Sequence, residues 1–462
     1  MKKEYLFLLF IFCFSVLGSA QDIQPFQKGD RISFLGNSIT DGGRYHSYIW
    51  LYYMTRFPDR RIEVFNAGIG GDVVKMMNDR FKEDVLPQHP NVIVLTFGMN
   101  DSDYFIYLQP GADTASKARI KTAKKNYALL EKRLKELADV RKILMTSTPY
   151  DENVKFKNPG FTGKNAAILK INTFMEASAG KNNWEFIDLN NPMSTINQRE
   201  QKADSSFTLQ GKDRIHPEED GHLVMAYLFL KAQGLAGREI AEVKINTLSK
   251  EVQSEKYCSI SNLSVSPEIV RFHYKASSLP FPIDTISHGI WGATRTQAEA
   301  LKVIPFINEF NREMLYCSEL KGHKYQLNID GEKIGEWSGE AFARGINLAL
   351  LTNTPQYQQA MAIMYLNEER WEIERRLRVY AWYQFDILKD RGLLFKDDLA
   401  SIDTLQSLAS SNPFVKGSMQ GYLKARHPEV RAAWKSEMKL LTDKIYSINK
   451  PLLRKVEIKL IQ

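Results

Sequence analysis

Short apolar runs alternate with helical segments from residue 31 to about residue 235, and this alternation constrains the fold more than any other feature of the chain. Runs bounded by turn residues predict buried strands at residues 31–35, 62–65, 91–97, 142–146 and 184–188. Between them, apolar residues recur at helical spacing, most clearly at residues 117–138, 164–177 and 218–233. Such alternation is typical of a doubly wound α/β domain built on a parallel sheet.

The pattern changes near residue 240, where strands and helices no longer alternate regularly. Strand-like stretches are expected at residues 269–274 and 325–329, and the second is followed by the hairpin signal Asp330-Gly331. Helical stretches are expected at residues 295–310, across most of 339–388, and at 415–448. The predicted units are an α/β domain over residues 21–240, a linker over residues 241–256, and a mixed, helix-rich C-terminal domain over residues 257–462.

The first twenty residues have the pattern of a cleavable signal peptide. Lys2 and Lys3 precede an apolar run at residues 6–17, which is followed by the small residues Gly18-Ser19-Ala20. The run is too short to span a bilayer, and no longer apolar run follows it. We therefore expect export to the periplasm or the medium, with no stable membrane insertion after cleavage at residue 20.

The net charge of +8 raises the question of a nucleic-acid partner. The basic surplus is spread along the chain and is densest in the tail at residues 431–462. No basic stripe interleaved with aromatic residues accompanies it, so the surplus is interpreted as solvated surface. Nucleic acid is not an expected partner, and the oligomeric state is left open.

Three cysteines in 462 residues exclude a disulfide scaffold and any zinc site built from cysteine pairs. Cys13 lies inside the expected signal peptide. Cys258 and Cys317 could pair in an oxidising compartment, or they could remain as two buried thiols.

Polar and glycine-rich loops follow the first three predicted strands, and a fourth precedes the last helix of the α/β region. They are residues 36–42, 66–72, 98–101 and 213–217. The carboxyl ends of strands line the ligand crevice of an open α/β sheet, so these loops are expected to meet there. Each alone has a simpler explanation, since a serine caps helices, glycines form turns, and an Asp three residues before a His is common.

Together the loops supply the parts of a serine hydrolase. Ser38 is a weak nucleophile unless an imidazole takes its proton, and His216 is suited to do so with Asp213 fixing its tautomer. The oxyanion that develops on the substrate needs donors aimed at it in advance. The backbone N–H groups of Ser38 and Gly71 and the side-chain amide of Asn100 are the predicted donors.

In these residues the chain resembles the SGNH or GDSL-type hydrolases, whose four blocks are named for Ser, Gly, Asn and His. The blocks occur here in that order as Ser38, Gly71, Asn100 and His216. Asn37 departs from the GDSL signature, which has Asp there, but that Asp is not the acid of the triad. The resemblance covers residues 30–235 and implies a flavodoxin-like three-layer α/β/α fold that hydrolyses esters through an acyl-serine, without cofactor or metal.

The remainder is similar to an extension found in some exported bacterial members. The likeness rests on residues 325–331, 345–349 and 354–356, and it carries no catalytic assignment. Several tryptophans there could stack on sugars or could belong to the core: Trp291, Trp337, Trp371 and Trp382. Other histidines are interpreted as surface or structural: His46, His89, His222 and His427.

These observations predict an exported serine esterase that removes acetyl or other small acyl groups from carbohydrate. A lipase or lysophospholipase acting on lipid esters is the alternative within the enzyme class. A non-catalytic glycan-binding protein on the same fold is the alternative from another class. The complete triad argues against it, because binding alone does not need one.

Overall fold

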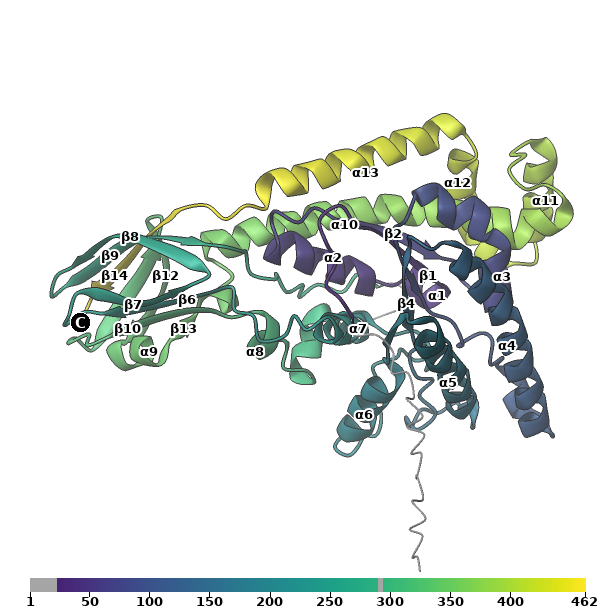
Figure 1. Ribbon diagram of the computed structural model, residues 1–462, viewed down its shortest axis with the longest axis horizontal. Coiled ribbons are helices and arrows are strands. Elements are labelled where there is room, and N and C mark those ends of the chain that lie inside the picture. Colours follow the sequence, from purple (N-terminus) through teal and green to yellow (C-terminus); the bar gives the residue numbers. More distant parts are fainter. Residues whose placement is uncertain (1–22, 290–293) are drawn as a thin grey trace, which may run out of the picture.

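The computed structural model describes residues 23–289 and 294–462, and the chain forms two lobes side by side (Figure 1). The expected signal peptide and Trp291 lie outside the described residues. No helix among the described residues is long and apolar enough to cross a membrane.

The larger lobe is an α/β domain around a five-stranded parallel sheet of order β2-β1-β3-β4-β5. Its strands are β1 Arg31–Gly36, β2 Glu63–Gly68, β3 Val92–Leu95, β4 Arg141–Met145 and β5 Glu185–Ile187. All five occupy the stretches where apolar runs predicted them. Because β1 has β2 on one side and β3 on the other, the chain order reverses at β1, and a ligand crevice is expected at its carboxyl end.

Helices cover both faces of this sheet, which makes three layers. Side chains alternate along the strands, so Val94 of β3 belongs to one core and Leu95 to the other. One face is covered by α2 Tyr45–Arg56, α6 Asn190–Glu200 and α7 Glu219–Ala232. The other is covered by α3 Val74–Arg80, α4 Ala112–Glu136 and α5 Lys164–Asn182.

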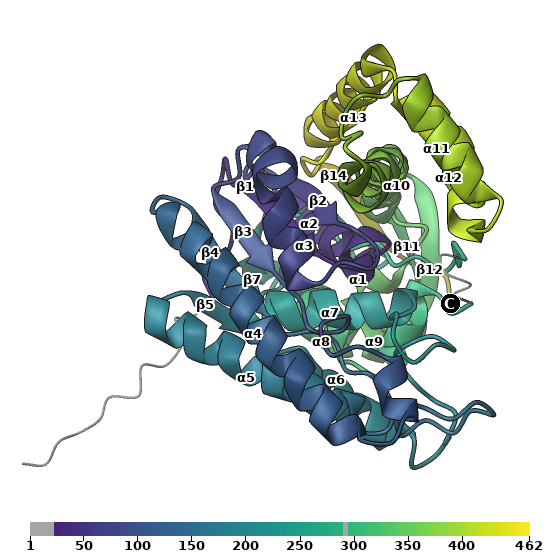
Figure 2. The same ribbon diagram turned by 90° about the vertical axis from the view of Figure 1, so that its right-hand side faces the viewer.

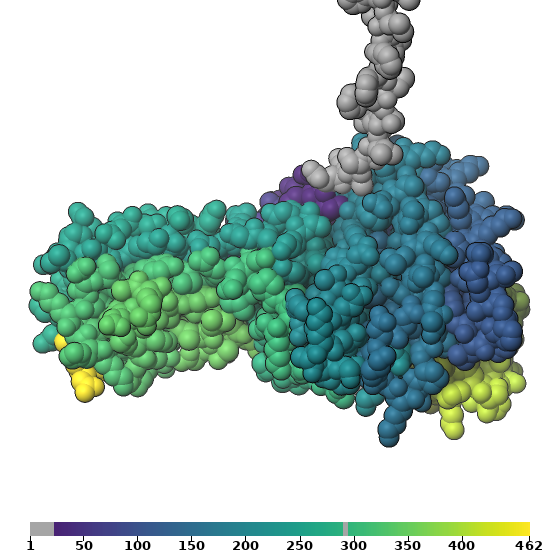
Figure 3. Space-filling model, turned by 90° about the horizontal axis from the view of Figure 1, so that it is seen from below, coloured from purple at the N-terminus to yellow at the C-terminus, as the bar shows by residue number. Residues whose placement is uncertain are grey.

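The smaller lobe is a β lobe built from two sheets that share one core, and it projects from the side of the α/β domain (Figure 3). One sheet has the order β13-β10-β6-β7, and the other has the order β12-β11-β14-β9-β8. The strands are β6 Ala241–Asn246, β7 Glu251–Lys256, β8 Cys258–Val265, β9 Ile269–Ala276, β10 Glu313–Ser318, β11 Lys324–Ile329, β12 Glu332–Ser338, β13 Ile346–Asn347 and β14 Arg454–Leu460.

The prediction that residues 241–256 form a linker is wrong. That stretch forms β6 and β7, which pair antiparallel with each other, and β6 also pairs parallel with β10. Val243 and Ile245 are buried and alternate with Glu242 and Lys244. This period-two pattern has charged residues at every second place, so it lacks the continuous apolar run that marked the strands of the α/β domain.

The helix expected at residues 295–310 is broken. A 3-10 turn at Gln297–Lys302 is followed by the short α8 Phe306–Phe310, with Pro305 at its N-cap. Proline has no backbone N–H and clashes with the preceding turn of a helix, so it separates the two pieces. The hairpin predicted at Asp330-Gly331 is confirmed, since β11 and β12 pair antiparallel around it.

Four C-terminal helices return from the β lobe to the α/β domain. They are α10 Pro355–Trp382, α11 Leu399–Ala409, α12 Pro413–Ala425 and α13 Pro428–Ile448. The long α10 runs beside α2 along the β2 edge of the parallel sheet (Figures 1 and 2). Ala360, Ile363 and Ile445 of these helices belong to the same apolar core as β1 and α2. The C-terminal half is therefore partly built into the core of the first domain.

Cys258 and Cys317 are both free thiols, and burial raises the pKa of each, to about 11 and about 12 respectively. Trp371 is buried, whereas Trp337 and Trp382 are half-buried. Of the histidines read as surface or structural, His46 and His222 are buried, and His89 and His427 are exposed.

Candidate active site

Ser38 lies directly beyond the carboxyl end of β1, at the start of the one-turn helix α1 Ser38–Asp41. Asn37 is the N-cap of that helix, and its side-chain oxygen accepts the N–H of Ile39 at 3.1 Å. Asn caps a helix as well as Asp does, so the departure from the GDSL signature preserves the local structure. Gly68 at the end of β2 packs against this turn, because a Cβ there would lie 2.2 Å from the backbone nitrogen of Asp41.

The three residues predicted as the triad form a continuous hydrogen-bonded chain. Ser38 Oγ lies 2.8 Å from His216 Nε2, and His216 Nδ1 lies 2.5 Å from Asp213 Oδ2. The other carboxylate oxygen of Asp213 accepts the N–H groups of Ile215 and His216 at 2.9 and 3.0 Å. Burial alone would raise the pKa of Asp213, but these hydrogen bonds hold it below its usual range. Asp213 is therefore ionised at neutral pH and oriented to steady an imidazolium.

Arg214 fixes the loop that carries Asp213 and His216, and nothing in the sequence pattern indicates this role. Its backbone is left-handed, with φ of 67°, and its buried guanidinium donates to the carbonyls of Asp151, Val154 and Asn158 at 3.1, 2.8 and 2.8 Å. From the sequence alone, an arginine in a loop is expected to be exposed to solvent. The three carbonyls that bury Arg214 are more than 50 residues away in the chain, so no local pattern reveals them.

The loop after β2, which carries Gly71, passes close to the nucleophile at Gly70. A Cβ added to Gly70 would lie 3.9 Å from Ser38 Cβ. Gly71 has φ of 89°, in the left-handed region that favours glycine, while nothing lies within 4 Å of where its Cβ would stand. Backbone conformation rather than crowding therefore accounts for glycine here.

Asn100 is held by both ends of its amide. Its Nδ2 donates to the carbonyl of Asp72 at 2.9 Å, and its Oδ1 accepts the hydroxyl of Tyr104 at 2.5 Å. An amide nitrogen carries two N–H groups, so one is used for orientation and the second suits an oxyanion. The structure thus brings Gly71 and Asn100 into one loop cluster, as the predicted oxyanion assignment requires.

Buried charges tie the loops of this cluster together. Asp101 accepts the N–H of Val74 at 2.9 Å and the N–H of Gly98 at 3.0 Å, so it joins the loops after β2 and β3. Lys164 of α5 donates to the carbonyl of Met99 at 2.6 Å and to Ser102 Oγ at 2.7 Å. Burial lowers the pKa of Lys164 to about 7.

Helix α10 supports the same loops from the far end of the chain. Arg378 donates to the carbonyl of Gly68 at 2.9 Å and to both oxygens of Asp84 at 2.8 and 2.9 Å. Glu374 accepts the N–H of Asn66 at 2.9 Å, on the outer edge of β2. These residues lie 294 to 310 positions from their partners, and they were not predicted as part of the site.

We expect Asn100→Ala to lower kcat by a factor on the order of 10²–10³ with a smaller change in KM, because an oxyanion donor acts mainly in the transition state. Steady-state kinetics on a nitrophenyl acetate measures this. Tyr104→Phe is the matched control, since it removes the bond that orients the amide but keeps the donor, and its loss of kcat should be much smaller. An effect of Asn100→Ala on KM alone would make Asn100 a substrate-binding residue instead.

Asp101 makes the free energy of unfolding depend on pH. Burial, the largest cause, raises the pKa of Asp101 to about 6. Between about pH 4 and pH 6 the folded protein then holds a proton that the unfolded chain has lost, so the stability contribution of this group falls as pH rises. Relative to Asp101→Asn, the wild type should lose about 3 kcal/mol of unfolding free energy across this window. Urea unfolding at several pH values checks it, and parallel pH curves for the two proteins would contradict it.

Two family models match the chain. The GDSL-like Lipase/Acylhydrolase family matches residues 34–224, and the Diltiazem deacetylase C-terminal helical domain matches residues 361–450. The second match covers most of α10 and all of α11 to α13. It does not include the residues at 325–331, 345–349 and 354–356 on which the sequence likeness of the extension rested.

Two relatives are similar to the chain. A gut microbial diltiazem-metabolizing enzyme is 48% identical, with 96% of this chain and 100% of that chain covered and a TM-score of 0.93. An acetylxylan esterase from Geobacillus stearothermophilus is 23% identical over 228 residues, or 45% of this chain and 95% of the relative. The crystal structure of that esterase aligns with a TM-score of 0.35.

The match to the diltiazem-metabolizing enzyme extends over both lobes and the C-terminal helices, so the likeness is one of whole chains. The family models agree with the α/β fold of the larger lobe and with the helical C-terminal part. The chain belongs to the GDSL-like lipase/acylhydrolase family, and it is an ester hydrolase.

Proposed function

We propose that this protein is an exported serine esterase that removes acetyl groups from acetylated carbohydrates or similar small alcohols. The observation that carries the proposal is the hydrogen-bonded chain from Ser38 Oγ through His216 to Asp213. The preference for acetyl is supported by the names of the relatives, one an acetylxylan esterase and one a diltiazem-metabolizing enzyme, together with the diltiazem deacetylase domain model.

The proposed reaction begins when Ser38 Oγ attacks the acyl carbonyl and passes its proton to His216 Nε2. Asp213 stabilises the imidazolium that forms. The N–H groups of Ser38, Gly71 and Asn100 donate hydrogen bonds that stabilise the negative charge on the carbonyl oxygen. The tetrahedral intermediate collapses, and the leaving alcohol takes the proton from His216. Water, deprotonated by His216, then attacks the acyl-serine. The bond from the acyl carbon to Ser38 Oγ breaks, acetate is released, and His216 returns the proton to Ser38 Oγ.

An aromatic group beside Asn100 provides a surface for the alcohol part of the substrate. The ring of Phe161 lies 6.0 Å from Tyr104, 5.7 Å from Tyr150 and 6.1 Å from Phe105, between ring centroids. Phe105 is 72% exposed, so its ring is accessible to a ligand. Sugars and aromatic alcohols both bind to such rings by stacking.

The proposal is tested with a panel of substrates on the full chain, with Ser38→Ala as the matched control. Acetate release is measured from acetylated xylo-oligosaccharides and from diltiazem, and nitrophenyl esters of increasing chain length give the acyl preference. We expect kcat/KM for acetyl esters to exceed that for octanoyl esters at least tenfold. A preference for octanoyl esters or lysophospholipid would favour the lipase alternative, and no turnover of any ester would favour a glycan-binding protein.

Acetylated drug-like alcohols are the second candidate substrate class, favoured by the 48% identity to the diltiazem-metabolizing enzyme over the whole chain. The panel separates the two classes by their kcat/KM values. The class with the higher value is the better description of the alcohol site.

Phe105→Ala should raise KM for acetates of bulky aromatic alcohols by a factor of about 3–10 and leave kcat nearly unchanged, because one stacked ring contributes about 0.5–1.5 kcal/mol. Methyl or ethyl acetate serves as the control substrate, since its alcohol is too small to reach the ring. An equal effect on both substrates would show that Phe105 does not contact the alcohol part.

Export rests on Lys2, Lys3, the apolar run at residues 6–17 and the small residues before Gln21. The mass of the protein recovered from the periplasm or the medium of a bacterial host should correspond to a chain that begins near Gln21. Recovery of the unprocessed chain in the cytosol alone would contradict export.

A further inference from the structure

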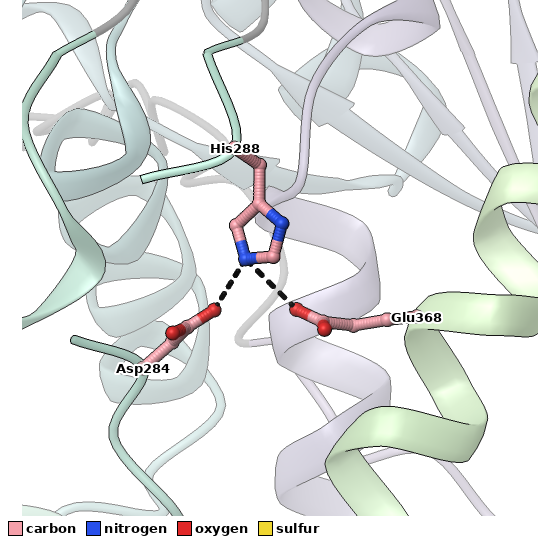
Figure 4. Close-up of side chains that lie close together, drawn as sticks. All are labelled: Asp284, His288 and Glu368. Carbon is pink, nitrogen blue, oxygen red and sulfur yellow. Dashed lines mark hydrogen bonds and ion pairs between the residues drawn. The ribbon is translucent and has the colours of Figure 1, made fainter. Parts of the chain in front are cut away.

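A cluster of ionisable side chains lies between the α/β domain and the C-terminal half, away from the catalytic triad. Asp284 and His288 come from the segment after β9, and Glu368 comes from α10 (Figure 4). His288 Nε2 lies 2.6 Å from Asp284 Oδ2 and 3.4 Å from Glu368 Oε1. One ligand atom from each of the three lies within 4.8 Å of the other two.

A further carboxylate, that of Glu219 at the start of α7, lies beside the cluster. Its Oε1 accepts the backbone N–H of His288 at 2.7 Å, and its carboxylate is within electrostatic range of Asp284. Glu219 is 2% exposed, yet its Oε2 has no hydrogen-bond partner among the described residues. The buried hydroxyl of Tyr48 interacts electrostatically with Glu219, Asp284 and Glu368. It too has no hydrogen-bond partner among the described residues. Buried polar oxygens are normally hydrogen-bonded, and these two have no such partner among residues 23–289 and 294–462.

The charges of the cluster do not balance. The carboxylates of Asp284, Glu368 and Glu219 face one fixed cation, Arg44. Its guanidinium lies 3.1 Å from Glu368 Oε1, and its side chain is 4% exposed. With a neutral imidazole this leaves an excess of two negative charges, which a divalent cation would neutralise. The alternative is an imidazolium at His288 that bridges Asp284 and Glu368, and it would still leave Glu219 Oε2 without a partner.

We propose that Asp284, His288 and Glu368 bind one divalent transition-metal cation beside Glu219, and that Zn²⁺ is the preferred ion. One imidazole nitrogen with carboxylate oxygens suits Zn²⁺ better than Ca²⁺ or Mg²⁺, which take oxygen ligands only. Bonds of about 2.0–2.2 Å in a tetrahedron place neighbouring ligand atoms about 3.3 Å apart. The pair of His288 and Glu368 already has this spacing, and Asp284 needs to withdraw by less than 1 Å.

The proposed ion would join two parts of the chain that are distant in sequence, beside a third. Glu219 lies three residues beyond His216, and Glu368 lies on the helix that also carries Glu374 and Arg378. Bound there, the cation fastens α10 to the segment after β9, which Glu219 at the start of α7 already holds through the His288 N–H. Its role is structural, and the hydrolytic chemistry at Ser38 does not involve it.

Zinc binding is tested on the full chain without an affinity tag, stripped with EDTA and then dialysed. Titration with ZnCl₂ followed by isothermal calorimetry and elemental analysis should give one Zn²⁺ per chain with a Kd in the micromolar range or below. The melting temperature should rise by several degrees on saturation, since an ion that binds only the folded state stabilises it. Absence of binding by the wild-type protein at tens of micromolar ZnCl₂ would overturn the proposal.

Variants locate the ion. His288→Gln and Glu368→Gln should each weaken zinc binding at least tenfold, whereas the exposed His427→Gln should leave it unchanged. X-ray absorption of the zinc-loaded wild type should show a shell of nitrogen and oxygen with a single imidazole, and this measurement does not depend on how well any variant folds. Undiminished binding in both cluster variants, or a shell with two or more imidazoles, would place the ion elsewhere and overturn the proposal.

Discussion

Ser38→Ala is expected to reduce kcat for a nitrophenyl acetate by a factor on the order of 10⁵ or more, to the limit of detection. The acyl-serine route needs the hydroxyl oxygen as the attacking atom, and alanine cannot replace it. The oxyanion donors at Gly71 and Asn100 remain, so only the slow reaction with water that they assist is left.

The stability of the Ser38→Ala protein should change little, because among the described residues the hydroxyl bonds His216 alone. Ser436→Ala is the control variant, since Ser436 is exposed on α13 and bonds only within its own helix. It should keep full activity. Turnover by Ser38→Ala at more than one-thousandth of the wild-type rate, in protein free of host esterase, would contradict the assignment.

Arg378→Ala should destabilise the fold strongly, although the residue lies outside the triad. The guanidinium bonds both oxygens of Asp84 and the carbonyl of Gly68, all of them buried. Its loss leaves Asp84 with Arg80 as its one remaining cationic partner among the described residues, and leaves the Gly68 carbonyl without its donor. Removal of one partner from a buried ion pair costs about 3–5 kcal/mol. Denaturant unfolding measures this loss.

The same change should also lower kcat, measured at a temperature where the variant is folded, because Gly68 begins the loop that carries Gly71. Arg376→Ala is the matched control, since Arg376 lies on the same helix but is exposed, and its cost should stay within about 1 kcal/mol. Equal stability of the two variants would show that α10 does not support the catalytic loops.

This support also predicts how the chain tolerates truncation. A fragment of residues 21–245 would lose Glu374 and Arg378 and would expose the core positions that Ala360, Ile363 and Ile445 now cover. We expect such a fragment to aggregate or to be inactive. The alternation of strands and helices predicts an independent domain because it depends on local structure alone. It contains no information on α10, which covers the outer edge of β2.

The catalytic loops were predictable because each is short, polar and attached to a strand that the sequence marks clearly. Ser38, Gly71 and Asn100 follow β1, β2 and β3 within a few residues, and the parallel sheet brings the three loops together without further information. Asp213 and His216 are in one turn, so their mutual placement is local as well.

The supporting charges were not predictable in the same way. Arg370, Glu374 and Arg378 recur every four residues on α10, and a charged stripe at this spacing is usually the solvent face of a helix. Here the stripe is buried against β2 and α2. Arg370 pairs with Glu374 on the same helix, and Glu374 and Arg378 bond groups of the α/β domain. Their identity depends on contacts between residues about 300 positions apart, which a pattern within one helix does not contain.

The central claim is that Ser38, activated by His216, forms the covalent intermediate. A fluorophosphonate reacts with such a serine and leaves a stable adduct, which peptide mass spectrometry locates. The account predicts one adduct per chain, on Ser38, that is absent from His216→Ala. Labelling at another residue, or equal labelling of Ser38 in the His216→Ala protein, would contradict it.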